Sequence, residues 1–314
     1  MSRFSTILRA TPAYLVLAVL SGPANATAAR TFVSGQGADA GSCPAAAPCR
    51  TFAFALAQTN SAGEIDVLDP ADYGPVIITK AISIVSDSVG AAGIQSAAGG
   101  QAITISAGAS DAVQLRGLTI DGAGVGGTGI ILLSGGNLEI VNCVVRNFAG
   151  SGIIIKPSTS AQFLVSGSIV DGNAAYGIIV LPLASAVVTG VIDRVVANGN
   201  KNGITVYGSQ ATSATLKVTI TDSIVSNNSN FGIYATSLVG HAATNVLINN
   251  SVVNYNNYGV GAWPNTILRI DHVSINGNGT GINKNTGTIY TYGNNGIDGN
   301  ATDNIGALTI IVQH

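Results

Sequence analysis

Charged residues are scarce in this chain. Asp, Glu, Lys and Arg make up 9% of the 314 residues, whereas an average globular domain has about 25%. The net charge is −2 and no basic cluster occurs in the sequence, so no feature indicates binding to nucleic acid or to anionic lipid. Disorder is disfavoured as well, because it accompanies low hydrophobicity and high net charge, and 46% of this chain is hydrophobic.

Long apolar runs are missing beyond the first 20 residues. No later stretch approaches the ~18 uninterrupted apolar residues that a membrane-spanning helix needs. The sequence therefore predicts no membrane partner. Low charge together with many Val, Ile, Thr and Asn residues favours stacked β-structure.

The N-terminus has the pattern of an export signal. Arg3 and Arg9 precede the apolar stretch from Tyr14 to Leu20, and Ala24-Asn25-Ala26 supplies a small-x-small cleavage site. We predict that residues 1–26 are a signal peptide and that residues 27–314 form one domain. The predicted location is secreted or periplasmic, since an export signal serves both.

Cysteine is also rare, with three in the chain. Cys43 and Cys49 flank a tight loop that contains two prolines, and in an exported chain this pair predicts a disulfide. Metal binding by the pair is disfavoured, because no further Cys or His lies nearby to complete a set of four ligands. Cys143 lies within a repeat and is interpreted as a small filler without a partner.

What the sequence has in abundance is a repeat. Gly-Ile or Gly-Val recurs at intervals of 22 to 29 residues, at positions 129, 152, 177, 203, 232, 259 and 281. A fixed period in the twenties is typical of a solenoid, in which each repeat is one coil stacked on the next.

Each repeat holds three apolar segments, and these predict three strand positions per coil. The first column of strands is Leu118–Ile120, Leu138–Ile140, Phe163–Val165, Val218–Ile220, Val246–Ile248 and Leu268–Ile270. A small or acidic corner follows each strand, then a second short apolar step such as Val144-Val145. The third strand is the one that begins with Gly-Ile.

Asparagine stands just upstream of most Gly-Ile pairs. These residues are Asn147, Asn173, Asn198, Asn227, Asn254 and Asn276. Equivalent corners of stacked coils lie one strand spacing apart, about 4.8 Å, so their side-chain amides can form a ladder of hydrogen bonds. Asn also tolerates the left-handed backbone of a sharp corner. We interpret this column as structural.

One helix is predicted, at Phe52–Gln58, which is rich in Ala and is followed by Asn60 to Gly63. A short helix before the first strands fits a cap over the open end of a solenoid, where unpaired strand edges need cover. We predict a cap and the first coils in residues 27–100, and regular coils in residues 101–314.

This combination of an export signal, a helical cap and repeated strand, Asn corner and Gly-Ile strand resembles the right-handed parallel β-helix (pectin-lyase-like) superfamily. The resemblance covers roughly residues 31 to 314 and implies an all-β, single-stranded right-handed β-helix. Members of that superfamily include polysaccharide lyases, polygalacturonases and alginate epimerases. Phage tailspikes and exported proteins without an assigned activity also belong to it.

The catalytic motifs of the polygalacturonase-like members are missing, and Asp69-Pro70 is not followed by the His of the epimerase-like motif. Lyase-like members use acidic residues on neighbouring coils to bind calcium, and Arg or Lys as the base. This sequence contains an incomplete version of that set of residues. It consists of Asp193, Asp222 and Asp271 in the corner column, with Arg194 and Lys217 near it. Calcium is a predicted cofactor only under this alternative; otherwise no metal or cofactor is predicted.

Aromatic side chains form the other candidate site. In the strand after each Gly, alternation turns the second and fourth residues outward. Tyr207, Tyr234 and Trp263 occupy such positions in three successive coils. Flat amphipathic rings in a strip can stack on the apolar faces of sugars, so these residues predict a glycan-binding strip.

Three functions therefore remain. The first is an exported, non-catalytic β-helix that binds extracellular polysaccharide or is displayed with it. The second is a calcium-dependent polysaccharide lyase-like enzyme. The third is a purely structural surface protein. The sequence favours the first narrowly over the third, leans against an enzyme, and leaves the oligomeric state open.

Overall fold

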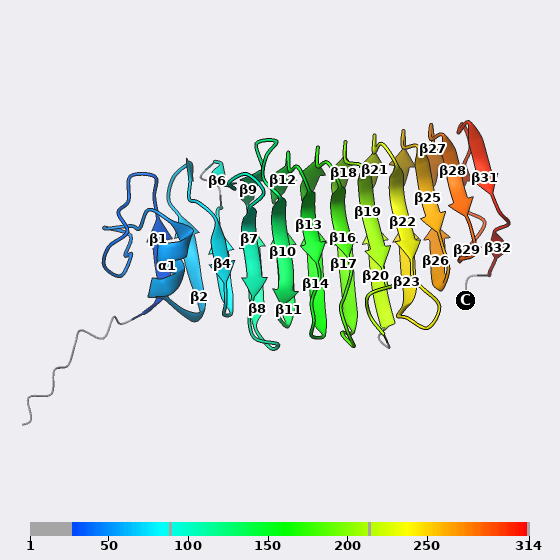
Figure 1. Cartoon of the computed structure of the whole chain (residues 1–314). Coiled ribbons are helices and arrows are strands. Elements are labelled where there is room, and N and C mark those ends of the chain that lie inside the picture. The colour runs from blue at the N-terminus through cyan, green and yellow to red at the C-terminus, as the bar shows by residue number, and fades with distance from the viewer. Residues whose placement is uncertain (1–26, 88–89, 213–214, 313–314) are drawn as a thin grey trace, which may run out of the picture.

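The structure is a computed structural model that describes residues 27–87, 90–212 and 215–312. It is a parallel β-helix in which the coils stack in one row, from the helix α1 at the N-terminal end to β32 near the C-terminal end (Figure 1). Each regular coil contributes one strand to each of three parallel sheets. The predicted all-β solenoid is thus confirmed, while the signal peptide predicted for residues 1–26 lies outside the described residues.

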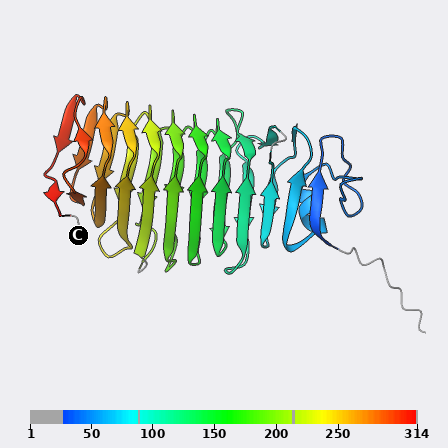
Figure 2. The same ribbon diagram turned by 180° about the vertical axis from the view of Figure 1, so that it is seen from behind.

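The three sheets run the length of the stack, as Figure 2 shows from behind. The 12-stranded sheet A consists of β1 (Ala28–Val33), β2 (Thr59–Val67), β5 (Ile82–Val85), β8 (Ala112–Arg116), β11 (Asn137–Val141), β14 (Ala161–Ser166), β17 (Val188–Asp193), β20 (Thr215–Thr221), β23 (Ala243–Asn249), β26 (Thr266–Asp271), β29 (Thr288–Thr291) and β32 (Thr309–Ile310).

Sheets B and C have 10 strands each. Sheet B consists of β3 (Ala71–Asp72), β6 (Ala92–Gln95), β9 (Leu118–Asp121), β12 (Val144–Arg146), β15 (Ile169–Asp171), β18 (Val196–Asn198), β21 (Ile224–Ser226), β24 (Val252–Asn254), β27 (Ser274–Asn276) and β30 (Gly296–Ile297). Sheet C consists of β4 (Val76–Ile78), β7 (Gln101–Ser106), β10 (Thr128–Ser134), β13 (Ser151–Ile155), β16 (Tyr176–Val180), β19 (Asn202–Tyr207), β22 (Phe231–Thr236), β25 (Tyr258–Ala262), β28 (Thr280–Lys284) and β31 (Thr302–Ile305).

One predicted strand belongs to a different column. Leu118–Ile120 lies in β9 of sheet B, whereas the sheet A strand of that coil is β8. The other five members of the predicted column do lie in sheet A. The physical reason is Gly117, whose positive φ of 69° makes the corner between β8 and β9, so that two short strands follow each other almost without a loop.

The interior is filled by columns of aliphatic side chains. The isoleucine or valine of each Gly-Ile strand pairs in register with its counterpart in the next coil, from Ile103 of β7 to Ile282 of β28. Both of these end members are 0% exposed. Each such side chain contributes roughly 1.5–3 kcal/mol by leaving water, so repetition of one residue type stabilises the whole stack.

The asparagine ladder exists, but most of its members differ from the predicted ones. It runs along the corner between sheets B and C through Asn173, Asn200, Asn228, Asn256, Asn278 and Asn300, each amide donating to the Oδ1 of the next at 2.9–3.2 Å. Of the predicted members only Asn173 belongs to it. Asn147 and Asn227 hold the left-handed corner itself, with φ of 59° and 54°. The others, Asn198, Asn254 and Asn276, end strands of sheet B.

The ladder also explains the Gly-Ile pattern. A Cβ at Gly232 would lie 2.7 Å from the side-chain nitrogen of Asn256 in the next coil. The same relationship joins Gly203 to Asn228, at 2.8 Å. Glycine is therefore required where the ladder amide of the following coil occupies the space of a side chain.

The N-terminal end is closed by α1 (Phe52–Gln58), as predicted. Thr51 caps the helix by accepting a hydrogen bond from the Phe54 amide, and Phe52 and Leu56 are buried against the first coils. The residues after the helix form the start of β2 rather than a loop. The predicted disulfide between Cys43 and Cys49 is present, and Cys143 is free and buried. Within the described residues, no helix has the length and hydrophobicity to cross a membrane.

Candidate functional site

The outer face of sheet C carries the three predicted aromatic residues. Tyr207 ends β19, Tyr234 lies in β22, and Trp263 follows β25 directly. All three are partly exposed. Tyr234 pairs in register with Thr205 on one side and Gly261 on the other, so the three aromatics lie on consecutive coils, as the repeat predicts.

Four rings on this face form one cluster, which we call the aromatic platform: Phe231, Tyr234, Tyr258 and Trp263. Phe231 stacks between the two tyrosines, with centroids 4.7 Å from Tyr234 and 4.8 Å from Tyr258. Trp263 meets Phe231 and Tyr234 edge-on, at 5.3 and 5.1 Å. These separations are typical of favourable aromatic pairs. Tyr207 lies on the neighbouring coil, where it pairs in register with Thr236.

Phe231 and Tyr258 were not among the site residues predicted from the sequence. Strict alternation places Phe231 on the same side as Ile233, inside the coil. Alternation fails because Gly232 also faces inward, toward the Asn256 amide, so that the residue before the glycine is turned outward. The signal that could have found these residues is the aromatic that directly precedes glycine in Phe231-Gly232 and Tyr258-Gly259.

Gly261 makes room for the platform. A Cβ on Gly261 would lie 2.8 Å from the Phe231 ring and 2.9 Å from the Trp263 ring. Because Gly261 has no side chain, both rings can pack against the backbone of β25. The position is in register with Tyr234, so the rings and the glycine form one packed surface.

The phenol of Tyr234 is partly desolvated. Burial raises its pKa above the ordinary value of 10, a hydrogen bond with Thr236 opposes that change, and the neighbouring Tyr207 and Tyr176 hydroxyls add to it. Tyr234 is therefore a neutral hydrogen-bonding group over the physiological pH range.

The acidic residues do not form one column. Asp193 and Asp271 end β17 and β26 and share a row with Thr221 and Asn249. Asp222 lies one position further, at the left-handed corner, with φ of 51°. The prediction that the three acids share the corner column is therefore wrong. In the coils of Asp193 and Asp271 the residue at the left-handed corner is Arg194 and His272, respectively.

Each acid has its own partners. Asp193 pairs with Arg194 at 2.7 Å and accepts a hydrogen bond from Ser166. Asp222 accepts hydrogen bonds from Asn250 and Thr221, which lower the pKa of its carboxyl.

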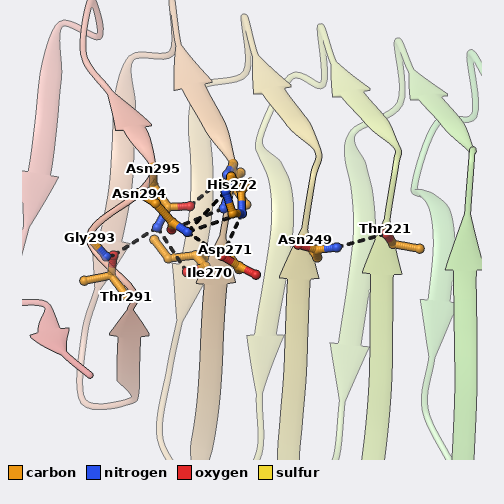
Figure 3. Close-up of polar contacts among 10 residues, drawn as sticks. Thr221, Asn249, Ile270, Asp271, His272, Thr291, Gly293, Asn294 and Asn295 are labelled. Atoms are coloured by element: carbon orange, nitrogen blue, oxygen red, sulfur yellow. Dashed lines mark hydrogen bonds and ion pairs between the residues drawn. The ribbon is translucent and has the colours of Figure 1, made fainter. Parts of the chain in front are cut away.

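Asp271 lies 2.9 Å from His272 and accepts a hydrogen bond from the Asn294 amide at 2.7 Å, as Figure 3 shows. Nearby, Asn249 donates to Thr221. Among the described residues, no group of three or more His, Cys, Asp or Glu side chains could hold a metal ion.

Lys217 lies away from these acids. It belongs to β20 and pairs in register with Thr189 and Asn245. Together with Arg269 it lines a groove of about 680 Å³ on sheet A. None of the residues that line this groove is acidic. The geometry therefore separates Lys217 from the predicted calcium ligands, whereas Arg194, the other predicted cation, stays in contact with Asp193.

Comparison with known proteins agrees with this architecture. Residues 80–218 match the family described as "Right handed beta helix region". No curated protein sequence matches the chain. Among solved structures, pectate lyase Pel9A is similar over 85% of this chain and 75% of its own, with 15% identity and a TM-score of 0.58.

Two further structures are similar at lower TM-scores. The A-module of mannuronan C-5 epimerase AlgE4 from Azotobacter vinelandii matches over 80% of this chain and 91% of its own, with 15% identity and a TM-score of 0.47. ORF18 of Geobacillus virus E2 matches over 75% of this chain and 52% of its own, with 13% identity and a TM-score of 0.47. At such identities the likeness concerns the fold alone. The chain therefore has the fold of a right-handed parallel β-helix.

Proposed function

We propose that this protein is an exported, non-catalytic β-helix that binds extracellular polysaccharide on the aromatic platform. The observation that carries the proposal is the contact between four rings on the outer face of sheet C, over a glycine that leaves them room. Because the rings already pack against one another without a ligand, we expect little side-chain conformational entropy to be lost when a ligand binds.

The chemistry of the platform suits a sugar chain. The C–H faces of a pyranose ring are apolar and stack on aromatic rings, while hydroxyl groups at its rim bond polar side chains. Tyr234 and Tyr258 offer both features in one side chain, and Trp263 adds an N–H donor. The likeness in fold to a pectate lyase supports a role connected with polysaccharide.

Export is part of the proposal. The N-terminal pattern of residues 1–26 and the disulfide between Cys43 and Cys49 support a secreted or periplasmic location, because disulfides persist in oxidising compartments.

A calcium-dependent lyase-like enzyme remains a second candidate, favoured by the groove on sheet A that contains Lys217 and Arg269. Two cations in one groove suit a uronate polymer, and Lys217 would serve as the base. Against this candidate, the acids that would hold calcium lie outside the groove lining. The test of this second candidate is to measure the chain length of polygalacturonate and alginate after incubation with the protein and calcium. Only an enzyme would shorten these polymers.

Affinity electrophoresis in gels that contain neutral or acidic polysaccharides tests the proposed function. We expect at least one polymer to retard the protein, and Trp263→Ala and Tyr234→Ala each to remove most of the retardation. Tyr255→Ala is the matched control, since Tyr255 is an exposed aromatic outside the platform. A purely structural surface protein would show no retardation in any polymer, and that result would contradict the proposal.

A further inference from the structure

A groove of about 410 Å³ adjoins the platform on the outer face of sheet C. Its lining includes Ile131, Ile154 and Ile179, from β10, β13 and β16. These three residues are in register with one another, and Ile179 is in register with Thr205, which pairs with Tyr234. The groove therefore follows the same row of outward positions that leads to the platform.

Aromatic side chains continue from the platform into the groove. Tyr176 and Tyr207 both line it, one coil apart. Both hydroxyl groups influence the ionisation of Tyr234, which places them close to the platform. The groove and the platform thus lie on neighbouring coils of the same sheet, with Tyr207 of the groove lining one coil from Tyr234 of the platform.

Lys156 is the one ionisable cation in the lining of this groove. It follows β13 directly and is partly buried. The groove lining contains no carboxylate, and Lys156 forms no ion pair with any carboxylate of the described residues. An ammonium group without a counter-ion beside it attracts an anionic group of a ligand.

We infer that the platform and the groove are one binding site for an acidic glycan, in which Lys156 pairs with a carboxylate while Tyr207, Tyr234 and Trp263 stack on sugar faces. Lys156 lies two coils from Tyr207, or about 10 Å at one strand spacing per coil. A carboxylate therefore meets the cation at one end of a bound chain whose other sugars cover the rings. This inference rests on the proposed function and names the class of polysaccharide.

The test compares two polymers that share a backbone, polygalacturonate and its methyl ester, which lacks the charge. Binding of each is measured for the wild-type protein, Lys156→Gln, Lys156→Arg and Trp263→Ala. Lys201→Gln is the matched control, because Lys201 is an exposed lysine outside the groove lining.

We expect the wild-type protein to bind polygalacturonate more tightly than the ester, with a difference that shrinks as salt is added. Lys156→Gln should weaken binding of polygalacturonate about fivefold, the effect of one partly exposed ion pair, and leave binding of the ester unchanged. Lys156→Arg should restore the preference, and Lys201→Gln should change neither polymer.

Two results would overturn the inference and leave the proposed function intact. In the first, the wild-type protein binds both polymers equally and Trp263→Ala abolishes binding of both. The other is a preference for polygalacturonate that survives in Lys156→Gln but disappears in Lys217→Gln, since that would assign the charge selectivity to the groove on sheet A. If Trp263→Ala bound both polymers as tightly as the wild-type protein does, that result would instead contradict the proposed function itself.

Discussion

Trp263 meets Tyr234 edge-on, with ring centroids 5.1 Å apart and ring planes at 74°. The two residues come from adjacent coils, so their contact depends on the register between β22 and β25. The platform is therefore a product of the stacking itself, and changes that disturb the stack or the space between these rings should be visible at Trp263, the only tryptophan of the chain.

Gly261→Ala should disturb the platform without unfolding the protein. The new methyl group would lie within 2.9 Å of the Phe231 and Trp263 rings, so both rings must move outward, at a cost of about 1 kcal/mol. We expect a shift in the emission of Trp263 and weaker retardation by polysaccharide. Gly296→Ala is the control, because nothing lies within 4 Å of a Cβ there. Unchanged emission in Gly261→Ala would show that the rings do not rest on this position.

Asn256→Ala should be strongly destabilising. The Asn256 amide donates to the carbonyl oxygens of Val225 and Asn254 and to the Asn278 side chain. Its oxygen accepts two hydrogen bonds from Asn228. Because these buried partners would be left unsatisfied, we expect the free energy of unfolding to fall by about 2–4 kcal/mol in urea titrations.

Asn276→Ala provides the matched comparison. The sequence alone places Asn276 in the ladder, whereas among the described residues its side-chain amide donates to the nearby Ser274 hydroxyl and not to another asparagine. We expect a change within about 0.5 kcal/mol. Equal destabilisation by Asn276→Ala and Asn256→Ala would contradict the ladder described above.

Asp69 should make the N-terminal cap sensitive to acid. Hydrogen bonds from the Ser34 hydroxyl and the Gly35 amide hold the pKa of the Asp69 carboxyl below its usual value, and Tyr73 contributes a third. A lowered folded-state pKa stabilises the protein above the unfolded-state pKa of about 3.9. That contribution is lost as the pH falls through the folded-state pKa.

We therefore expect Asp69→Asn to have a lower melting temperature than the wild-type protein at pH 7, and the gap to narrow below pH ~4. Thermal unfolding followed by circular dichroism at several pH values measures it. A gap that is constant from pH 7 to pH 2 would show that ionisation of Asp69 does not stabilise the cap.

The disulfide should stabilise the cap modestly. Cys43 and Cys49 lie six positions apart in the sequence, and closing so short a loop contributes about 2 kcal/mol in the chain-entropy account. The double variant Cys43→Ala/Cys49→Ala should lower the urea midpoint by a corresponding amount. Reductant should lower the wild-type midpoint in the same way and leave the double variant unaffected; a wild-type midpoint insensitive to reductant would oppose this prediction.

The sequence predicted the architecture because the stack repeats one solution many times. The Gly-Ile period, the helix at Phe52–Gln58 and the cysteine pair were each sufficient to locate their elements. The phase of the ladder was not predictable, since Asn227 and Asn228 are adjacent and identical in type. Only the left-handed backbone at Asn227 decides which of them points inward.

The candidate site was predictable in part. Tyr207, Tyr234 and Trp263 follow from alternation within a strand. Phe231 does not, because an inward glycine interrupts the alternation and only the three-dimensional packing of Gly232 against Asn256 reveals this. The groove, and the lack of a carboxylate beside Lys156, depend on residues from several neighbouring coils. The sequence of a single repeat therefore does not predict either feature.

The emission of Trp263 during titration with polygalacturonate tests the central claim most directly. The described fold places this single tryptophan in the platform and in contact with two of its rings. A saturable shift or quenching of its emission, which disappears in Tyr234→Ala, is the result that the proposed glycan site predicts. Retardation by the polymer without any change at Trp263 would place the binding site elsewhere and contradict the account.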